Sequence, residues 1–235
     1  MRIQPWSALA ALSLLCACGR APDRDGDGLT DAAEEELGTD PRSADSDGDG
    51  FEDLEELSAG GDPLLCWSVP QGWPDCRVQG EDIEGEGFAQ GDVVLDAPLV
   101  EADGSTLSLR HFSTMVVVID LSAGWCGPCQ QSTPRMQALA DSYDESDGVA
   151  VVQVMVAGWN QGSLSDGFLE QWRDMFSLSI PVTAPVPGES DLEQALLDAG
   201  TYTGSVPSFL VLSRDQELIY VGSESGVAAA VEAAL

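Results

Sequence analysis

Hydrophobic positions in the C-terminal part of the chain alternate between continuous apolar runs and amphipathic stretches. Residues 115–121 and 149–156 are apolar runs rich in β-branched side chains, which is typical of strands buried on both faces. The other predicted elements are a helix that ends near residue 143, helices at 166–176, 191–199 and 226–235, and a hairpin of strands at 206–212 and 217–222. This alternation predicts an α/β domain.

Charge is distributed unevenly along the 235 residues, a length that fits one medium domain and a smaller attachment. The chain has 41 Asp and Glu residues, nine Arg and no Lys, which gives a net charge of −32. That charge disfavours binding to nucleic acid or anionic lipid, because a polyanion is repelled. Sixteen of the acidic residues lie between Asp23 and Asp62, so the acidity there indicates local chemistry.

Two twelve-residue segments, 23–34 and 45–56, repeat the same pattern 22 residues apart. Each has Asp at positions 1, 3, 5 and 9, Gly at 6, an apolar residue at 7 and Glu at 12. A hard dication needs six or seven oxygen ligands, and alternating Asp, a Gly turn and a final bidentate Glu supply them. The candidate metal-binding residues are Asp23, Asp25, Asp27, Leu29, Asp31 and Glu34 in the first loop and Asp45, Asp47, Asp49, Phe51, Asp53 and Glu56 in the second.

Each repeat ends in Asp-Pro, at 40–41 and 62–63, and the segment resembles thrombospondin type 3-like calcium repeats over about 40 residues. The resemblance implies calcium as the cofactor and a calcium-rigidified spacer. The alternatives are a calcium switch, which would need a long helix before each loop, and a disordered acidic tether. We expect dissociation constants of about 0.1–1 mM and a looser segment without the ion, because the loop carboxylates repel one another.

The N-terminus has the pattern of a targeting segment. Residues 6–15 are apolar but too few to span a bilayer. The following Leu15-Cys16-Ala17-Cys18-Gly19 resembles a bacterial lipobox, which implies lipidation of Cys18. Gly19, in place of Asp, favours the outer membrane of a Gram-negative bacterium, facing the periplasm or the surface. The alternative is an ordinary secretory signal, and either places the mature chain outside the cytoplasm.

Four cysteines remain after Cys16 and Cys18, an even number in an oxidising compartment. Cys66 and Cys76 flank a short segment containing Trp and Pro, and we expect a structural disulfide between them. A metal role is disfavoured because the sequence around them has no further Cys or His, and the only His is His111. The Gly- and acid-rich residues 77–92 predict a linker.

The sequence Trp125-Cys126-Gly127-Pro128-Cys129 follows a buried strand, and Val206-Pro207 precedes another. These motifs resemble those of thioredoxins, and the extra helix and short strand between 156 and 206 are similar to TlpA/ResA-type periplasmic members. The resemblance covers 92–235. It implies a thioredoxin fold with a mixed central sheet flanked by helices, and a redox-active disulfide between Cys126 and Cys129 without an organic cofactor.

Helix geometry assigns roles to this pair. The N–H groups and dipole of a helix N-terminus lower the pKa of a thiol below about 8.5, so Cys126 is the attacking residue. Cys129, one turn later, resolves the mixed disulfide. Pro128 fixes the first helical turn.

The resemblance implies further roles near this pair. Asp120 matches a buried proton relay, with a surface or strand-end acid as the alternative. A cis Pro207 would present the Val206 backbone to a substrate, and Trp125 would pack beside the site. The lysine that usually accompanies the buried Asp is absent, so we expect only a moderate depression of the thiol pKa, which makes a strongly oxidising role less favoured.

The predicted organisation is a signal peptide (1–18), two calcium loops (19–65), a Cys-containing segment and linker (66–91) and a thioredoxin-like domain (92–235). We predict an extracytoplasmic, lipid-tethered thiol-disulfide oxidoreductase. Its partners would be protein thiols or disulfides, an electron donor or acceptor that the sequence does not identify, and the membrane, but no nucleic acid. The alternatives are a calcium-dependent scaffold or adhesion lipoprotein with a vestigial redox domain, and a thiol peroxidase, for which Ser122-Ala123-Gly124 lacks the expected Thr and Arg.

Overall fold

The computed structural model describes residues 21–70, 74–80, 83–186 and 192–235. The predicted signal peptide with Cys16 and Cys18 lies outside the described residues.

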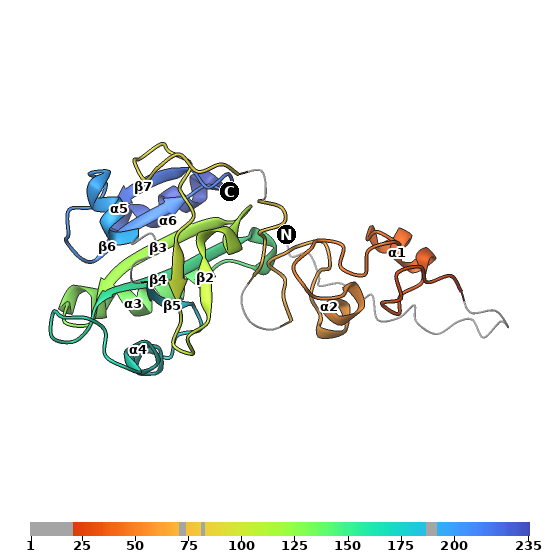
Figure 1. Ribbon diagram of the computed structural model, residues 1–235, viewed down its shortest axis with the longest axis horizontal. Coiled ribbons are helices and arrows are strands. Elements are labelled where there is room, and N and C mark those ends of the chain that lie inside the picture. The colour runs from red at the N-terminus through yellow and green to blue at the C-terminus, as the bar shows by residue number, and fades with distance from the viewer. Residues whose placement is uncertain (1–20, 71–73, 81–82, 187–191) are drawn as a thin grey trace.

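A seven-stranded mixed sheet forms the centre of the larger domain (Figure 1). Its order is β2-β1-β5-β4-β3-β6-β7; β4 pairs in parallel with β3 and β5, and the other pairs are antiparallel. All eight residues of β3 are buried, as expected for a continuous apolar run at the centre of a sheet. The strands are β1 Pro98–Val100, β2 Thr106–Ser108, β3 Val116–Ala123, β4 Val149–Ala157, β5 Val182–Pro185, β6 Ser208–Leu212 and β7 Leu218–Gly222.

Helices cover both faces of this sheet, which confirms the predicted α/β class with a mixed sheet flanked by helices. Side chains of α3, α4 and α6 pack on one face against alternate residues such as Val116 and Val118. Side chains of α5 and of the segment before β3 pack on the other, against Val117 and Ile119. The helices are α3 Gly127–Ala140, α4 Phe168–Phe176, α5 Leu192–Asp198 and α6 Glu224–Ala234, with 3-10 turns η2 Leu109–Phe112 and η3 Glu145–Asp147.

The two acidic repeats form an arm that projects from the sheet domain, with α1 farther from the domain than α2 (Figure 1). Helices α1 Asp31–Leu37 and α2 Asp53–Ala59 each begin inside a loop motif and end at a left-handed glycine. The repeats contact each other, because the Leu54 amide donates to Asp27 Oδ2 at 3.2 Å. Leu54 also fills the space beside Gly28, where an added Cβ would lie 2.8 Å from its Cδ2. The arm is therefore one packed unit.

The described part of the predicted linker packs against the sheet domain. Phe88 is buried in the core, and its carbonyl accepts from the Thr201 hydroxyl at 2.7 Å. The Gly91 amide donates to the Leu218 carbonyl of β7 at 2.9 Å. A single apolar residue such as Phe88 in a Gly-rich segment forms no periodic pattern, so the sequence does not predict its burial.

Candidate functional site

Cys126 and Cys129 are joined by a disulfide at the N-terminus of α3, directly after the turn that follows β3. Cys126 is the N-cap residue of α3, and its Sγ accepts from the Cys129 amide at 3.1 Å. A sulfur in this place lies at the positive end of the helix, where a thiolate is stabilised. Pro128 is in the first turn, where its missing N–H costs no helical hydrogen bond.

Both cysteines of the pair are buried, next to an exposed tryptophan. Cys126 is 2% exposed, whereas Cys129 is fully buried. Trp125 beside them is 44% exposed, which is unusual for so large an apolar side chain.

The Val206–Pro207 peptide bond is cis, and the Val206 carbonyl oxygen lies 3.5 Å from Cys126 Sγ. The Val206 side chain packs against the cluster formed by Ala123, Cys126 and Cys129. A pocket opens beside the disulfide, and its lining includes Trp125, Ala157, Gln161, Glu193, Tyr202 and Val206.

Asp120 lies in the middle of β3, inside the domain and not at the surface. Its Oδ1 accepts from Ser122 Oγ at 2.7 Å and its Oδ2 accepts from Gln153 Nε2 at 2.8 Å. Burial raises the pKa of Asp120 to about 6, although the two hydrogen bonds act in the opposite direction.

Gln153 is the residue directly opposite Asp120 in the parallel β3–β4 pair. Sequence reasoning missed this residue. Gln153 is a buried polar residue within the apolar run of β4. Aligning the two apolar runs as paired strands would have placed it next to Asp120.

The aspartates of each acidic loop converge. Ligand oxygens of Asp23, Asp25 and Asp27 lie within 4.8 Å of one another, and the same holds for Asp45, Asp47 and Asp49. The three carboxylates of each set lie close enough to repel one another. A cation bound between them would remove this repulsion.

Glu34 and Glu56, at position 12 of the loops, are fully buried, and neither side chain has a hydrogen-bond partner for either oxygen. Burial, and then the neighbouring aspartates, raise the pKa of Glu56 to about 9. Unpaired buried carboxylates are costly, and a bound dication would satisfy them. The residues present therefore fit calcium, which both carboxylate oxygens of such a Glu would chelate.

The aspartates at position 9 have protein partners. Asp31 Oδ1 accepts from the Arg24 amide at 3.2 Å, and its Oδ2 forms an ion pair with the Arg24 side chain. Asp53 accepts from the Ser46 amide at 2.8 Å and from its hydroxyl at 2.7 Å. These residues brace the loops. At position 7, the amides of Leu29 and Phe51 donate to the aspartates two residues before them.

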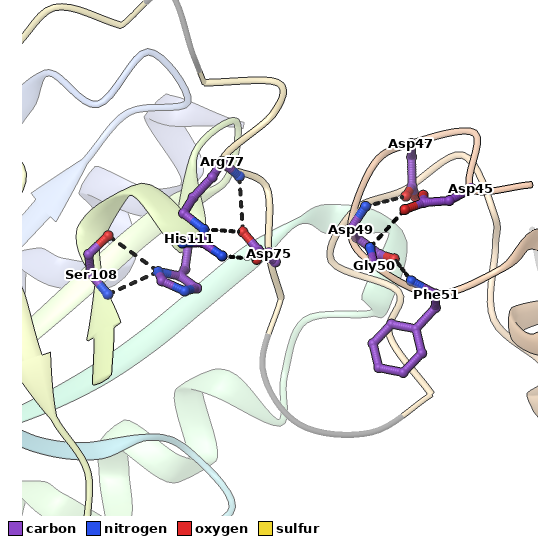
Figure 2. A network of polar contacts seen from close by, with 9 residues as sticks. All are labelled: Asp45, Asp47, Asp49, Gly50, Phe51, Asp75, Arg77, Ser108 and His111. Atoms are coloured by element: carbon purple, nitrogen blue, oxygen red, sulfur yellow. Dashed lines mark hydrogen bonds and ion pairs between the residues drawn. The ribbon is translucent and has the colours of Figure 1, made fainter. Parts of the chain in front are cut away.

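Residues 74–80, which we call the strap, contact the second loop. Figure 2 shows Asp75 and Arg77 of the strap together with the aspartates of that loop. The Gln79 side chain donates to the Asp47 carbonyl, and Val78 lies against Gly48, where an added Cβ would be 3.1 Å from its Cγ1. Asp75 and Arg77 form an ion pair within the strap.

The strap and the residues before it are also fixed to the sheet domain. Cys66 and Cys76 form a disulfide, and the Cys76 amide donates to the His111 carbonyl at 3.0 Å. Tertiary structure thus brings the only histidine beside a cysteine pair that the sequence places far from it. Trp67 contacts Arg214, whose guanidinium carbon lies 5.9 Å from its ring centroid.

Comparison with known families gives two matches. Residues 89–235 match the family model described as Redoxin. Residues 23–44 and 45–65 each match the model of the bacterial TSP3 repeat, which confirms the predicted repeat type.

Individual relatives match part of the chain. The thiol-disulfide oxidoreductase ResA of Oceanobacillus iheyensis is 32% identical over 103 residues, which are 44% of this chain and 50% of that protein. The thioredoxin-like protein YneN of Bacillus subtilis is 28% identical over 96 residues, 41% of this chain and 54% of that protein. The chain thus spans about half the length of these two relatives.

Among solved structures, the thioredoxin domain of a thiol-disulfide oxidoreductase from Bacteroides vulgatus superimposes with a TM-score of 0.51 at 14% identity. The match covers 63% of this chain and 98% of that one, and it bears on the fold alone. Within the described residues, no helix is long and apolar enough to span a bilayer.

Proposed function

The chain belongs to the Redoxin family and its sheet domain has the thioredoxin fold, and on this premise we propose that it is an extracytoplasmic thiol-disulfide oxidoreductase. The observation that carries the proposal is the Cys126–Cys129 disulfide at the N-terminus of α3, with Cys126 as the N-cap and the cis Val206–Pro207 bond beside it. A sulfur in that position is a nucleophile and a good leaving group at neutral pH.

The reaction exchanges one disulfide for another. In the reducing direction, the Cys126 thiolate attacks a substrate disulfide, a mixed disulfide forms and one substrate thiolate leaves. The Cys129 thiol then loses its proton and attacks Cys126 Sγ, so the enzyme disulfide forms and the second substrate thiolate leaves. Two electrons pass from the enzyme to the substrate, and the reverse sequence oxidises a substrate dithiol.

Asp120 is the proton acceptor that we assign to the second step. A carboxyl with a pKa of about 6 holds its proton more strongly than an exposed one, so it can take and return a proton near neutral pH. The absence of lysine removes a cation that would lower this pKa.

The substrates that suit this site are protein thiols and disulfides. The Val206 backbone lies beside Cys126 and offers hydrogen bonds to an extended peptide, and exposed Trp125 gives it an apolar contact. A second dithiol protein or a small thiol would supply or accept the electrons.

The acidic arm acts as a calcium-rigidified spacer in this proposal. The support is the pair of buried glutamates without partners, the converging aspartates and the contact between the repeats. Calcium would bind to the aspartates at positions 1, 3 and 5, to the main-chain carbonyl at position 7 and to both carboxylate oxygens at position 12, which gives six oxygens and neutralises charges that otherwise push the loops apart.

The arm is attached to the sheet domain at the opposite end of β3 from the redox site. Cys66 Sγ lies 3.8 Å from Thr114 Oγ1, just before β3, whereas Cys126 follows the other end of that strand. The first and last of the eight residues of this strand are about 23 Å apart. A lipid on Cys18, which precedes the arm in the sequence, would therefore leave Cys126 facing away from the membrane.

Trapping the covalent intermediate tests the activity. Cys126→Ser should reduce a disulfide-bonded test protein no faster than background, whereas Cys129→Ser should accumulate a mixed disulfide that dithiothreitol releases. The double variant Cys66→Ala/Cys76→Ala is the control and should keep the activity. Wild-type turnover of hydrogen peroxide without turnover of the test protein would contradict the proposal.

Lipid attachment has a matched control in the neighbouring cysteine. Cys18→Ser should release the chain from membranes and abolish incorporation of labelled fatty acid, and Cys16→Ser should change neither. Membrane association of the Cys18→Ser chain would argue against the anchor.

A further inference from the structure

We propose that Gln153, held in one orientation by Trp172, is a positioning residue for the Asp120 carboxyl; this rests on the proposed role of Asp120 as proton acceptor. The inference starts from four side chains that come from four different elements. Asp120 is on β3, Gln153 on β4, Thr133 on α3 and Trp172 on α4, and all four residues are fully buried.

The amide of Gln153 can adopt only one of its two flipped orientations. An indole N–H is a donor and never an acceptor, so the 2.6 Å contact from Trp172 Nε1 must be made to Gln153 Oε1. Gln153 Nε2 then faces Asp120 Oδ2 at 2.8 Å and Thr133 Oγ1 at 2.9 Å. With both its N–H groups and its oxygen engaged, the side chain is a fixed donor to the carboxyl.

The same amide reaches the resolving cysteine through one further hydrogen bond. Thr133 Oγ1 donates to the Cys129 carbonyl at 2.9 Å and therefore accepts from Gln153. Gln153 thus ties the Asp120 carboxyl and the first turn of α3 to one another. Movement of either relative to the other would break a buried hydrogen bond.

The two oxygens of Asp120 differ in what their partners can do. Ser122 can turn its hydroxyl and accept, so the hydrogen bond at Oδ1 can reverse when the carboxyl gains a proton. Gln153 cannot reverse, because Trp172 fixes it, so Oδ2 stays an acceptor in both states. The geometry places the transferred proton on the Oδ1 side.

The other charged group acting on Asp120 is Glu224 on α6, which forms an ion pair with Arg135 on α3. Glu224 disfavours ionisation of Asp120, whereas the hydrogen bonds from Ser122 and Gln153 favour it. Among these groups only Gln153 combines contact with Asp120 and a link to Cys129. The neutral amide of Gln153 favours the ionised carboxylate of Asp120 through a hydrogen bond, as a lysine would through its charge.

The test follows Asp120 directly, by NMR titration of its carboxyl in the full oxidised chain. Gln153→Met keeps the length and loses the donor, so the midpoint should move up by about one pH unit, since a hydrogen bond to a charged group is lost. Gln153→Lys should move it down. Trp172→Phe frees the amide to flip and should move the midpoint in the same direction as Gln153→Met, by less.

The control is Gln137→Met on α3, whose side chain bonds to Asp141 and Ser179 instead, and it should leave the midpoint unchanged. The rate at which Cys129 resolves a mixed disulfide should follow the shifted midpoint in each variant. An unchanged midpoint in folded Gln153→Met, or shifts of the same sign in the Met and Lys variants, would overturn the inference. If the proposed function is wrong and the inference holds, the midpoints shift as expected but the wild-type chain exchanges no disulfide.

Discussion

Asp120 carries a charge that the interior of the domain disfavours. The side chain is fully buried, and burial raises its pKa to about 6. Because the folded pKa lies above the unfolded value of about 3.9, the folded state favours the protonated form. The stability that this proton contributes is fully present below about pH 4 and is lost as the pH rises through 6.

Asp120→Asn should therefore stabilise the protein in a pH-dependent way. The variant keeps the shape of the protonated acid, and Ser122 can accept from its amide. We expect the same free energy of unfolding as wild type near pH 4 and a gain of about 3 kcal/mol at pH 8, together with slower resolution by Cys129. Urea unfolding at both pH values measures it, with exposed Asp166→Asn as the control. A difference from wild type that is equal at both pH values would contradict the assignment.

The elements of this protein differ in how far the sequence could predict them. The twelve-residue loops and the apolar runs of β3 and β4 follow from local patterns, because their ligand spacing and burial repeat along the chain. Strands β1 and β2 are three residues each, too short for a period to emerge. The position of Gln153 depends on strand register and that of the strap on tertiary contacts, so neither has a local signal.

At the level of the loops, the buried glutamates should control calcium binding. Glu56→Gln removes a chelating oxygen from the second loop, and we expect its calcium affinity to fall about tenfold or more while the first loop is unchanged. Isothermal titration separates the two sites, with the exposed neighbour Glu55→Gln as the control. Glu34→Gln with Glu35→Gln makes the matching pair for the first loop. Equal effects of the buried and exposed variants would contradict the ligand assignment.

On the scale of the whole molecule, the arm reaches the redox domain through the strap and the Cys66–Cys76 disulfide. The net charge of −32 favours extension, and calcium would oppose it in the arm. The strap should therefore affect the stability of the protein and how far the arm extends. The Cys126 site lies at the opposite end of β3 from the strap.

Removing the strap disulfide should loosen the arm without disabling the site. A disulfide that closes a loop with a sequence separation of 10 contributes about 3 kcal/mol. Cys66→Ala/Cys76→Ala should lose about that much stability and give a broader distribution of arm positions in small-angle scattering. Loss of disulfide exchange in the folded double variant would show that the strap takes part in the reaction.

Removal of calcium should also loosen the arm. We expect the wild-type chain to have a larger hydrodynamic radius in excess chelator than in millimolar calcium, because the ten carboxylates at the ligand positions of the loops then repel one another. A radius that does not change on chelation would contradict the spacer proposal.

Disulfide exchange is best tested by the redox equilibrium of Cys126 and Cys129 in the purified chain, titrated against dithiothreitol and glutathione. We expect one two-electron transition that Cys126→Ser abolishes, with a midpoint closer to about −270 mV than to the roughly −120 mV of a strong oxidant. The missing lysine and the moderate stabilisation of the thiolate by the helix terminus place it there. A pair that neither opens nor closes across this range would contradict the account and leave the calcium arm as the functional part of the protein.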